Sequence, residues 1–396
     1  MENTPNASRL HVAIFGRRNS GKSTLMNAIT SHYAAVVSPH PGTTTDTVAR
    51  TMELHGVGAC LFVDTPGFDD CGELGELRVE RTLQTLKRID IAILLCDTLD
   101  LTLEREWVER IKQRNVPIIT AISKIDSRND TEQLAAQVAD SFDSVPLLLS
   151  GVDSFDIEPL RLAILRALPE GFAAHTILGN LVERGDLVML VMPQDPQAPK
   201  GRLILPQVQT LRELLDRGCS VVCSTGEGFE STLATLQHPP TLIVTDSQIF
   251  KRINDLRPAE SRLTSFSLLM AGYKGDIRAF VDGAAAIDRL RESSRVLIAE
   301  ACTHAPMSED IGREKIPRML RSRVGEGLTI DVVAGRNFPD DLTPYDLIVH
   351  CGGCMFNRPY MLSRIEQAQQ QQVAITNYGV AIAHLAGIEL ESLALE

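Results

Sequence analysis

A glycine-rich segment near the start of the chain is the first group of residues able to do chemistry. Residues 16–23 read Gly-Arg-Arg-Asn-Ser-Gly-Lys-Ser, and they follow an apolar run and open a helical pattern. Glycines let a backbone wrap around an anion, which the N–H groups of a helix N-terminus then hold. We expect Lys22 to reach the β- and γ-phosphates of a nucleoside triphosphate and Ser23 to bind Mg²⁺. The residues expected to contact the nucleotide here are Gly16, Asn19, Ser20, Gly21, Lys22, Ser23 and Thr24.

Two later segments carry groups for the γ-phosphate and the metal ion. Asp64 and Gly67 belong to an Asp-Thr-Pro-Gly segment at the end of an apolar run. A carboxylate there can hold Mg²⁺ through water, and the Gly67 N–H can contact the γ-phosphate. Thr44, in the threonine-rich segment 42–46, is expected to bind Mg²⁺ while the γ-phosphate is present and to release it after hydrolysis. Thr43 is a second candidate, and a plain polar loop is the alternative interpretation.

Candidates for base recognition follow the later apolar runs of this region. Asp126 ends the segment Ser-Lys-Ile-Asp, and its carboxylate can accept hydrogen bonds from N1 and N2 of guanine. Adenine lacks that pair of donors, so Asp126 favours GTP over ATP. Lys124 can pack its stem along the base, and Ser150 with the residue after it can offer a main-chain contact to the guanine O6.

These elements, in this order, resemble the P-loop GTPase family and specifically its TrmE/Era-like branch, over residues 10–170. Members of the family usually begin the base-recognition segment with Asn, where this chain has Ser123, so the resemblance implies weaker nucleotide binding with the guanine preference kept. Many GTPases place a water-orienting Gln after the Asp-x-x-Gly segment, but this chain has Phe68, which cannot orient water. Asp69 and Asp70 are weaker candidates for that task, and two solvated turn carboxylates are the favoured interpretation.

The same resemblance implies how hydrolysis is catalysed. Asn19 stands at the loop position of the potassium-binding Asn of the TrmE-like branch, so a K⁺ ion would take the place of an arginine finger. A cation beside the β/γ bridge offsets the charge that develops in the transition state. The expected catalytic set is Lys22, Thr44, Asn19 and Gly67, and the expected reaction is slow, potassium-activated hydrolysis of GTP to GDP and phosphate.

A second chemical group lies in the last third of the chain. Cys302 and His304 follow one apolar run, and His350, Cys351 and Cys354 follow another. Because functional sites of parallel sheets form at the carboxyl ends of the strands, we expect these thiols and imidazoles to converge. Three thiolates suit either an iron–sulfur cluster or a zinc site completed by His, and spacing alone leaves both open. A buried thiol beside a fortuitous Cys-x-x-Cys is the third interpretation.

Joined behind a TrmE-like GTPase region, this cysteine pattern resembles the FeFe-hydrogenase maturation GTPase (HydF) family over essentially the whole chain. The segments 271–276 (Ala-Gly-Tyr-Lys-Gly-Asp) and 309–313 (Glu-Asp-Ile-Gly-Arg) share in the resemblance. It implies a homodimeric scaffold and carrier for the transient diiron subcluster precursor. The precursor is built with radical-SAM maturases and handed to immature FeFe-hydrogenase.

For the cysteine pattern itself, the resemblance implies that Cys302, Cys351 and Cys354 ligate a 4Fe–4S cluster. His304 and His350 match the pattern as candidate ligands, and either could instead hydrogen-bond the cluster or tune its potential. Three cysteines leave one iron of the cluster without a thiolate ligand. That iron can hold the cargo by an exchangeable bond, which suits a site that must release it.

Short apolar runs alternate with helical patterns along almost the whole chain, which predicts an α/β fold of three blocks with mainly parallel sheets. The first block is expected to have the P-loop GTPase fold. The predicted domains are a TrmE/Era-like GTPase domain (1–171), a dimerisation domain (172–261) and an Fe–S cluster-binding domain (262–396). The predicted strands are Leu10–Phe15, Ala59–Asp64, Asp90–Cys96, Val116–Ser123, Val145–Ser150, Leu187–Met192, Cys219–Ser224, Thr241–Asp246, Val296–Ala301, Leu328–Val333, Tyr345–His350 and Val373–Asn377.

Net charge and hydropathy limit the classes of partner and the cellular location that we expect. The 39 Lys and Arg residues against 51 Asp and Glu give a formal net charge of -12, so the chain has no global attraction to nucleic acid or to an anionic membrane. No apolar run reaches the roughly 18 residues needed to span a bilayer, and Met1–Arg9 lacks an apolar signal core, so we expect a cytoplasmic protein. The alternative function is a zinc-containing GTPase acting in ribosome assembly or tRNA modification, which predicts a basic surface for RNA.

A few single residues also carry predictions. Trp107 is expected to pack on the first sheet. The acids 309–310 suit a helix N-terminus, whereas Arg313 and Lys274 either support the structure or line a pocket for an anionic cargo. The cysteines outside the pattern are expected to be small core residues, namely Cys60, Cys71, Cys96, Cys219 and Cys223.

Overall fold

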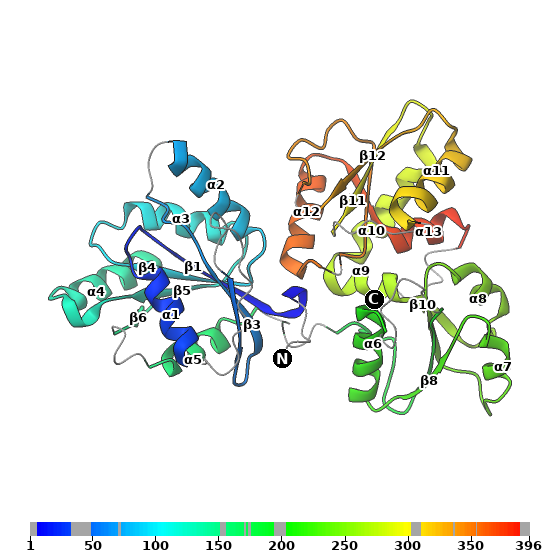
Figure 1. The fold of residues 1–396 in the computed structure, drawn as a ribbon, viewed down its shortest axis with the longest axis horizontal. Coiled ribbons are helices and arrows are strands. Elements are labelled where there is room, and N and C mark those ends of the chain that lie inside the picture. The colour runs from blue at the N-terminus through cyan, green and yellow to red at the C-terminus, as the bar shows by residue number, and fades with distance from the viewer. Residues whose placement is uncertain are drawn as a thin grey trace. The chain divides into compact units, whose positions relative to one another are not determined.

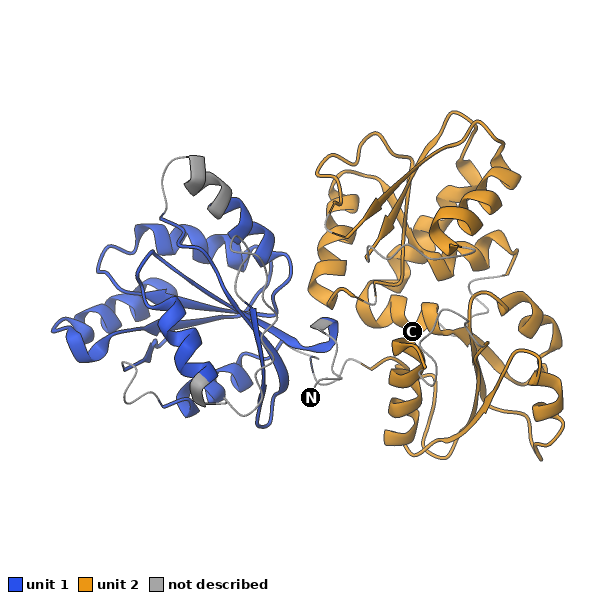
Figure 2. Ribbon diagram, in the orientation of Figure 1, with its two compact units in different colours: residues 1–174 blue, residues 175–396 orange. Residues whose placement is uncertain are grey.

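The computed structural model describes residues 6–32, 49–69, 73–150, 156–169, 172, 176–193, 203–301, 310–335, 337–353 and 355–388. The chain divides into two compact units, residues 1–174 and residues 175–396 (Figure 2). The first unit holds one sheet and the second holds two, so the described strands form three sheets (Figure 1). The predicted fold class, α/β with mainly parallel sheets, is confirmed.

The first unit is built on a six-stranded sheet in the order β2-β3-β1-β4-β5-β6. All neighbours are parallel except β2 and β3, which pair antiparallel as a hairpin. β2 was not predicted, because this half-exposed edge strand has no continuous apolar run. The strands are β1 (Leu10–Gly16), β2 (Ala49–Leu54), β3 (Gly58–Asp64), β4 (Ile91–Cys96), β5 (Ile118–Ile122) and β6 (Leu147–Leu148).

Helices cover both faces of this sheet, and alternate residues of each strand supply the two cores. In β1, Val12 and Ile14 pack toward α1 and α5, whereas Ala13 and Phe15 pack toward α3 and α4. Side chains alternate between the faces of a strand, and both faces are buried here, so the strand reads as a continuous apolar run. The helices are α1 (Lys22–His32), α2 (Glu73–Leu86), α3 (Thr102–Lys112), α4 (Thr131–Phe142) and α5 (Glu158–Arg166).

The second sheet has four parallel strands in the order β10-β9-β7-β8. The sequence assigned residues 262–265 to the third block, but this segment is β10 and pairs with β9. Its four residues are too few to show a strand pattern beside the following helix. The elements are β7 (Leu187–Val191), α6 (Leu205–Asp216), β8 (Ser220–Ser224), α7 (Phe229–Leu233), β9 (Leu242–Thr245), α8 (Phe250–Leu256) and β10 (Arg262–Ser265).

The third sheet also has four parallel strands, in the order β12-β11-β13-β14. Its strands are β11 (Arg295–Glu300), β12 (Thr329–Ala334), β13 (Leu347–His350) and β14 (Ala374–Asn377). One buried cluster joins the second sheet to the third, containing Met189 and Ile243 from one and Leu297 and Ile348 from the other. The two sheets of the second unit therefore share a hydrophobic core.

Among the helices of the second unit that were not predicted, α9 and α13 share one feature. Both are apolar on nearly every side, so they lack the amphipathic period that marks a surface helix. None of the helices in the described ranges combines the length and the apolar character needed to cross a bilayer. The helices are α9 (Phe266–Lys274), α10 (Ile277–Ala284), α11 (Ile316–Val324), α12 (Arg358–Gln370) and α13 (Tyr378–Leu385), and a π-helical turn at Ile311–Lys315 precedes α11.

Candidate nucleotide site and cysteine site

The phosphate loop connects β1, which lies inside the first sheet, to α1. Asn19 and Gly21 have φ values of 62° and 97°, so the loop needs the left-handed region at both positions. Glycine adopts this region readily, and Asn is among the few other residues that tolerate it. The loop therefore curls because of these two residue types, and α1 begins at Lys22.

Ser23 and Asp64 meet at the edge where β1 and β3 end. The Ser23 hydroxyl donates to Asp64 Oδ2 at 2.7 Å, and Asp64 Oδ1 is buried with no hydrogen-bond partner among the described residues. Burial raises the pKa of Asp64, whereas the Ser23 hydrogen bond and the Lys22 charge lower it. Oxygen donors of this kind suit Mg²⁺. The structure thus brings together the two residues predicted to bind or face the metal ion, and they fit it.

Lys22 lies inside the curl of the loop. Its side chain is buried, and Nζ donates to the Gly16 and Arg17 carbonyls at 3.0 and 2.6 Å. These bonds hold the ammonium at the anion-binding backbone. Its contact with the phosphates stays a prediction.

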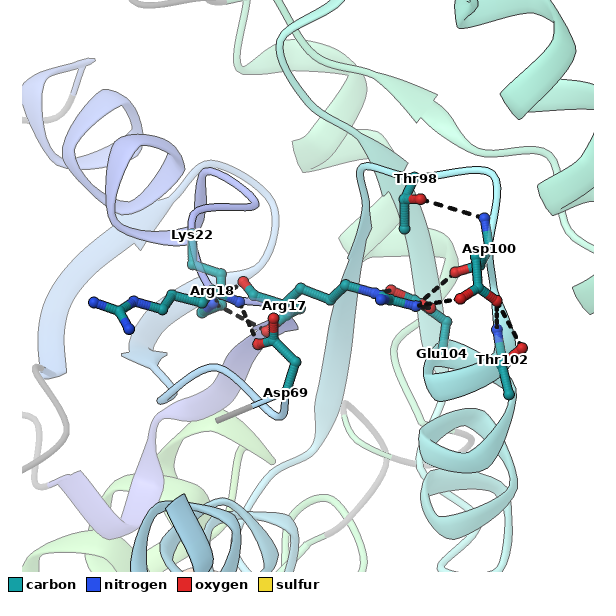
Figure 3. Close-up of polar contacts among 9 residues, drawn as sticks. Arg17, Arg18, Lys22, Asp69, Thr98, Asp100, Thr102 and Glu104 are labelled. Atoms are coloured by element: carbon teal, nitrogen blue, oxygen red, sulfur yellow. Dashed lines mark hydrogen bonds and ion pairs between the residues drawn. The ribbon is translucent and has the colours of Figure 1, made fainter. Parts of the chain in front are cut away.

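The Asp-Thr-Pro-Gly segment packs directly on the phosphate loop. A Cβ at Gly67 would lie 2.7 Å from the Arg18 main-chain N, so no larger residue fits without a shift of the backbone. The same Arg18 N–H donates to Asp69 Oδ1 at 2.6 Å (Figure 3). Asp69 therefore bonds the loop, which is a different role from the solvated turn carboxylate that we favoured.

Phe68 points into the core. It is 5% exposed and stacks on Trp107, with ring centroids 5.4 Å apart. Trp107 also lies 6.1 Å from Phe15 of β1, so its predicted packing on the first sheet is confirmed. The residue after Gly67 cannot orient water, in agreement with the prediction.

The base-recognition segment is tied to the phosphate loop by two hydrogen bonds. The Ser123 hydroxyl donates to the Ser20 carbonyl at 2.5 Å, and Lys124 Nζ donates to the Asn19 carbonyl. Ser123, the departure from the family pattern, thus links the two segments. Asp126 is exposed in a short 3₁₀ helix after β5, and Ser150 is half-buried just after β6. Their contacts to guanine stay predictions.

Sequence reasoning missed an anchor of the phosphate loop. The Arg17 guanidinium donates to both Glu104 carboxylate oxygens, at 2.8 and 3.0 Å, and to the Asp100 carbonyl at 2.6 Å (Figure 3). Glu104 is 0% exposed and shares the buried face of α3 with Trp107. A carboxylate at an apolar position of an amphipathic helix is the signal that could have found this pair.

Several predicted site residues lie outside the described part of the chain, so their placement stays a prediction. They are Thr43, Thr44, Asp70, Cys71, Cys302, His304, Glu309 and Cys354.

Two neighbouring strands lead into the two halves of the cysteine pattern, whose convergence stays a prediction because Cys302, His304 and Cys354 lie outside the described residues. β11 and β13 pair in parallel, and Cys351, just after β13, donates its N–H to the Ala299 carbonyl at 2.9 Å. The Ala301 N–H in turn donates to Cys351 Sγ at 3.0 Å. No group of three His, Cys, Asp or Glu side chains able to hold a metal occurs within the described ranges, which exclude Cys302 and Cys354. A sulfur that accepts a main-chain N–H fits a thiolate ligand.

His350 is fully buried beneath this sulfur-bearing loop. Its Nδ1 lies 2.7 Å from the Cys351 carbonyl, and its Nε2 lies 2.7 Å from Nη1 of Arg364. Arginine only donates, so Nε2 accepts and Nδ1–H donates. Burial and the Arg364 charge lower the pKa of His350 to about 3. Both ring nitrogens are engaged by the protein, which favours the second of its two predicted roles, a hydrogen-bonding neighbour of the site, over that of a ligand.

Lys274 and Arg313, the two basic side chains predicted either to support the structure or to line a pocket, both contact other groups of the protein. Lys274 is buried and donates to the Phe356 carbonyl at 2.9 Å, so it holds the loop after Cys351. Arg313 pairs with Glu300 at 3.0 Å. Asp310 accepts from the main-chain N–H groups of residues 312 and 313, which confirms its predicted place at a helix N-terminus.

The remaining described cysteines differ in exposure. Cys60 and Cys96 are buried, and burial raises the pKa of each to about 12. Cys219 is buried, but Cys223 is exposed on the edge strand β8, so the prediction that it is a core residue is wrong. An edge strand leaves one face of its residues open to solvent.

Curated relatives match the first part of the chain. The GTPase Era of a Thermoanaerobacter species is 31% identical over 166 residues, which cover 40% of this chain and 55% of that protein. The tRNA modification GTPase MnmE of Chromobacterium violaceum is 34% identical over 155 residues, which cover 39% of this chain and 34% of that protein. The chain thus spans about half or less of the length of these relatives.

Two solved structures show a partial likeness to the chain. Era of Aquifex aeolicus bound to GDP and AlF4⁻ is 21% identical, and the match covers 54% of this chain and 92% of that chain with a TM-score of 0.34. The G domain of the T. maritima FeoB iron transporter is 23% identical, and the match covers 40% of this chain and 98% of that chain with a TM-score of 0.31. Both are likenesses of fold alone.

Three family models match the chain in succession. A 50S ribosome-binding GTPase model matches residues 11–124, and the hydrogen maturase F dimerization domain matches residues 177–275. The hydrogen maturase F tetramerization domain matches residues 278–394, the region in which we predicted the cluster-binding domain. Together the two maturase models span more than half of the chain. The chain therefore belongs to the hydrogen maturase F (HydF) family and carries a TrmE/Era-like GTPase domain.

Proposed function

We propose that this chain is a GTP-hydrolysing scaffold that binds a 4Fe–4S cluster at Cys302, Cys351 and Cys354 and delivers the diiron subcluster precursor to immature FeFe-hydrogenase. The observation that carries the proposal is the Cys351 sulfur, which accepts the Ala301 N–H at 3.0 Å. Cys302 is the residue after Ala301, and consecutive Cα atoms are about 3.8 Å apart. The strand pairing therefore supports a shared site for both cysteines.

The chain's own residues prepare this sulfur for a cluster. The Ala301 N–H points at Cys351 Sγ, and hydrogen bonds to sulfur tune iron–sulfur sites. His350 donates to the Cys351 carbonyl and so orients the cysteine without using a ligand position. When bound, the cluster would supply one iron without a thiolate for an exchangeable group. Release of a cargo needs such a group.

The nucleotide site supports the hydrolytic part of the proposal. Ser23 and Asp64 are already hydrogen-bonded to each other, and Asp64 Oδ1 is without a partner among the described residues. Mg²⁺, when bound there, neutralises charge on the β- and γ-phosphate oxygens. Lys22 holds its ammonium in the loop, and the close approach of Gly67 to Arg18 puts the γ-phosphate segment beside it.

The names of the two maturase domains support self-association, and we propose a homodimer as the smallest unit. Radical-SAM maturases are the proposed source of the precursor, and no nucleic acid or membrane partner is proposed. The alternative, a zinc-containing GTPase of ribosome assembly or tRNA modification, draws only on the likeness of the first part of the chain to Era and MnmE. The maturase models over residues 177–394 favour the scaffold.

Metal analysis with EPR tests the cluster. Full-length chain is reconstituted anaerobically beside Cys302→Ala, and Cys223→Ala serves as the control because its thiol is exposed on β8, outside the pattern. We expect about four iron and four sulfide per chain, as for a 4Fe–4S cluster, with a reduced-cluster signal that Cys302→Ala loses and Cys223→Ala keeps. Stoichiometric zinc without iron uptake would support the alternative function.

Potassium dependence tests the proposed role of Asn19. Hydrolysis of GTP is measured in KCl and in NaCl for the wild type and Asn19→Ala. Asn115→Ala is the matched control, because Asn115 also has a positive φ, of 53°, in the same unit. We expect about tenfold or greater stimulation by K⁺ in the wild type and in Asn115→Ala, and none in Asn19→Ala. Equal wild-type rates in both salts would exclude a potassium site.

A further inference from the structure

The second unit buries an arginine that has no acidic partner among the residues the structure describes. Arg364, on α12, is 2% exposed. In the described part of the chain no carboxylate forms an ion pair with it, and its Nε is buried without a hydrogen-bond partner. Buried charges are ordinarily paired or ligated, because an isolated ion loses its hydration. An anion is therefore expected to bind beside this cation.

Neutral groups hold the guanidinium in place. Nη1 donates to His350 Nε2 at 2.7 Å, and Nη2 donates to the Gly335 carbonyl at 2.8 Å. The rings of Phe338, Phe356 and Tyr360 surround its central carbon, with centroids 4.5 to 4.8 Å away. Aromatic faces attract a cation without neutralising it. The positive charge is thus fixed in position and left uncompensated by these contacts.

His350 links the charge of Arg364 to Cys351. Arg364 contacts His350, and the other nitrogen of that ring contacts the Cys351 carbonyl. These two contacts join the guanidinium to the main chain of the cysteine through one imidazole ring. Burial lowers the pKa of Arg364, whereas Tyr360, by charge and hydrogen bond, and then Cys351, by charge, raise it. The anion that this site would pair with is therefore the thiolate of Cys351 together with whatever metal group that thiolate holds.

We propose that Arg364 is a positioning residue that supplies the counter-charge for the thiolate-held cluster at Cys351 and thereby sets the cluster's reduction potential. The inference rests on the proposed function. Reduction adds an electron, so a nearby fixed cation stabilises the reduced cluster more than the oxidised one. The low dielectric of a buried site strengthens this effect. Loss of the charge makes the cluster harder to reduce.

A purely structural arginine would behave differently. Its contacts to His350 and Gly335 and its packing among three rings would matter, but its charge would not. Arg364→Gln keeps a hydrogen-bonding amide and removes the charge, whereas Arg364→Lys keeps the charge and loses the planar fork. Arg295→Gln is the matched control. Arg295 is the first residue of β11 and pairs with Asp331, whereas the cysteine site lies beyond the other end of that strand.

The test is a redox titration followed by EPR on anaerobically reconstituted full-length chain, with iron content and circular dichroism recorded for each variant. We expect Arg364→Gln to lower the reduction equilibrium constant at least tenfold, which is a shift of about 59 mV for one electron. Arg364→Lys is expected to stay within about threefold of the wild type, because it carries the same charge. Arg295→Gln should match the wild type.

Each other outcome has a defined meaning. A folded, cluster-loaded Arg364→Gln with the wild-type potential would overturn the inference. If Arg364→Gln does not fold, Arg364→Lys decides: a loaded Lys variant whose reduction equilibrium constant falls tenfold, a shift of about 59 mV, also overturns it. If the wild type takes up no cluster, the proposed function itself fails, whereas a loaded wild type with an unchanged Arg364→Gln potential refutes the inference alone.

Discussion

The pair Arg17–Glu104 allows a quantitative test of how the phosphate loop is anchored. Glu104 is 0% exposed and the Arg17 side chain is 18% exposed, so the two partners are not equivalent. Arg17→Gln leaves a fully buried carboxylate without its cation. Glu104→Gln leaves an arginine that still reaches solvent and still donates to the Asp100 carbonyl at 2.6 Å.

These environments predict an asymmetry in the free energy of unfolding. Breaking a buried pair by removal of one partner costs about 3–5 kcal/mol, which we expect for Arg17→Gln. For Glu104→Gln we expect about 1–2 kcal/mol, because the remaining charge is partly solvated and keeps a hydrogen bond to the new amide. The double variant should show a coupling energy of at least about 1 kcal/mol between the two positions.

The assay is urea unfolding followed by the fluorescence of Trp107, the single Trp, which lies on the same helix as Glu104. Glu158→Gln is the control in the same unit, because the Glu158 carboxylate is 52% exposed in its i,i+3 pair with Arg161. Such a pair contributes much less to stability than a buried pair, because solvent screens the carboxylate. Equal costs for Arg17→Gln and Glu104→Gln, or costs no larger than that of Glu158→Gln, would refute the reasoning.

Asp90, Phe68 and Leu215 each allow a further prediction. Burial raises the pKa of Asp90 to about 7, so its contribution to stability is full below the unfolded value of 3.8 and is lost as the pH rises through 7. Asp90→Asn should therefore remove a decline in unfolding free energy of up to about 4 kcal/mol between acidic and alkaline pH, and an unchanged pH profile would contradict the pKa. Phe68 stacks on Trp107 and follows Gly67, so exchange of GDP for a GTP analogue with Mg²⁺ should change the fluorescence of Trp107, and Phe68→Leu should reduce that change. Val208 and Leu215 are 46% and 57% exposed on α6, inside the matched dimerization domain, so Leu215→Asp should shift the chain to smaller species in sedimentation, and unchanged sedimentation would place the interface elsewhere.

Local patterns predicted the elements whose residues define their own conformation. The phosphate loop is one, because its glycine, asparagine and lysine positions dictate a curl before a helix. The buried parallel strands are another, since strands buried on both faces appear in the sequence as short continuous apolar runs. The short edge strand β2 and the mostly apolar helices α9 and α13 were not predicted, because none of the three shows a clear strand or helix period in its sequence.

Contacts between distant segments could not be predicted from spacing. The Ser123 hydroxyl bonds the Ser20 carbonyl across 103 residues, so a departure from the family pattern becomes a link that only the fold reveals. His350 was predicted as a candidate ligand from its place beside Cys351. Its ring orientation depends on Arg364 from the next helix, and no rule of spacing gives that orientation.

Activation of immature FeFe-hydrogenase by this chain, after loading by the maturases, tests the central claim most directly. Wild-type chain is loaded, purified and mixed with immature hydrogenase, and hydrogen evolution is measured beside Cys351→Ala and the exposed-thiol control Cys223→Ala. The account predicts activation by the wild type and by Cys223→Ala, and none by Cys351→Ala. Equal activation by Cys351→Ala, or none by a wild-type chain that carries its iron, would contradict the account.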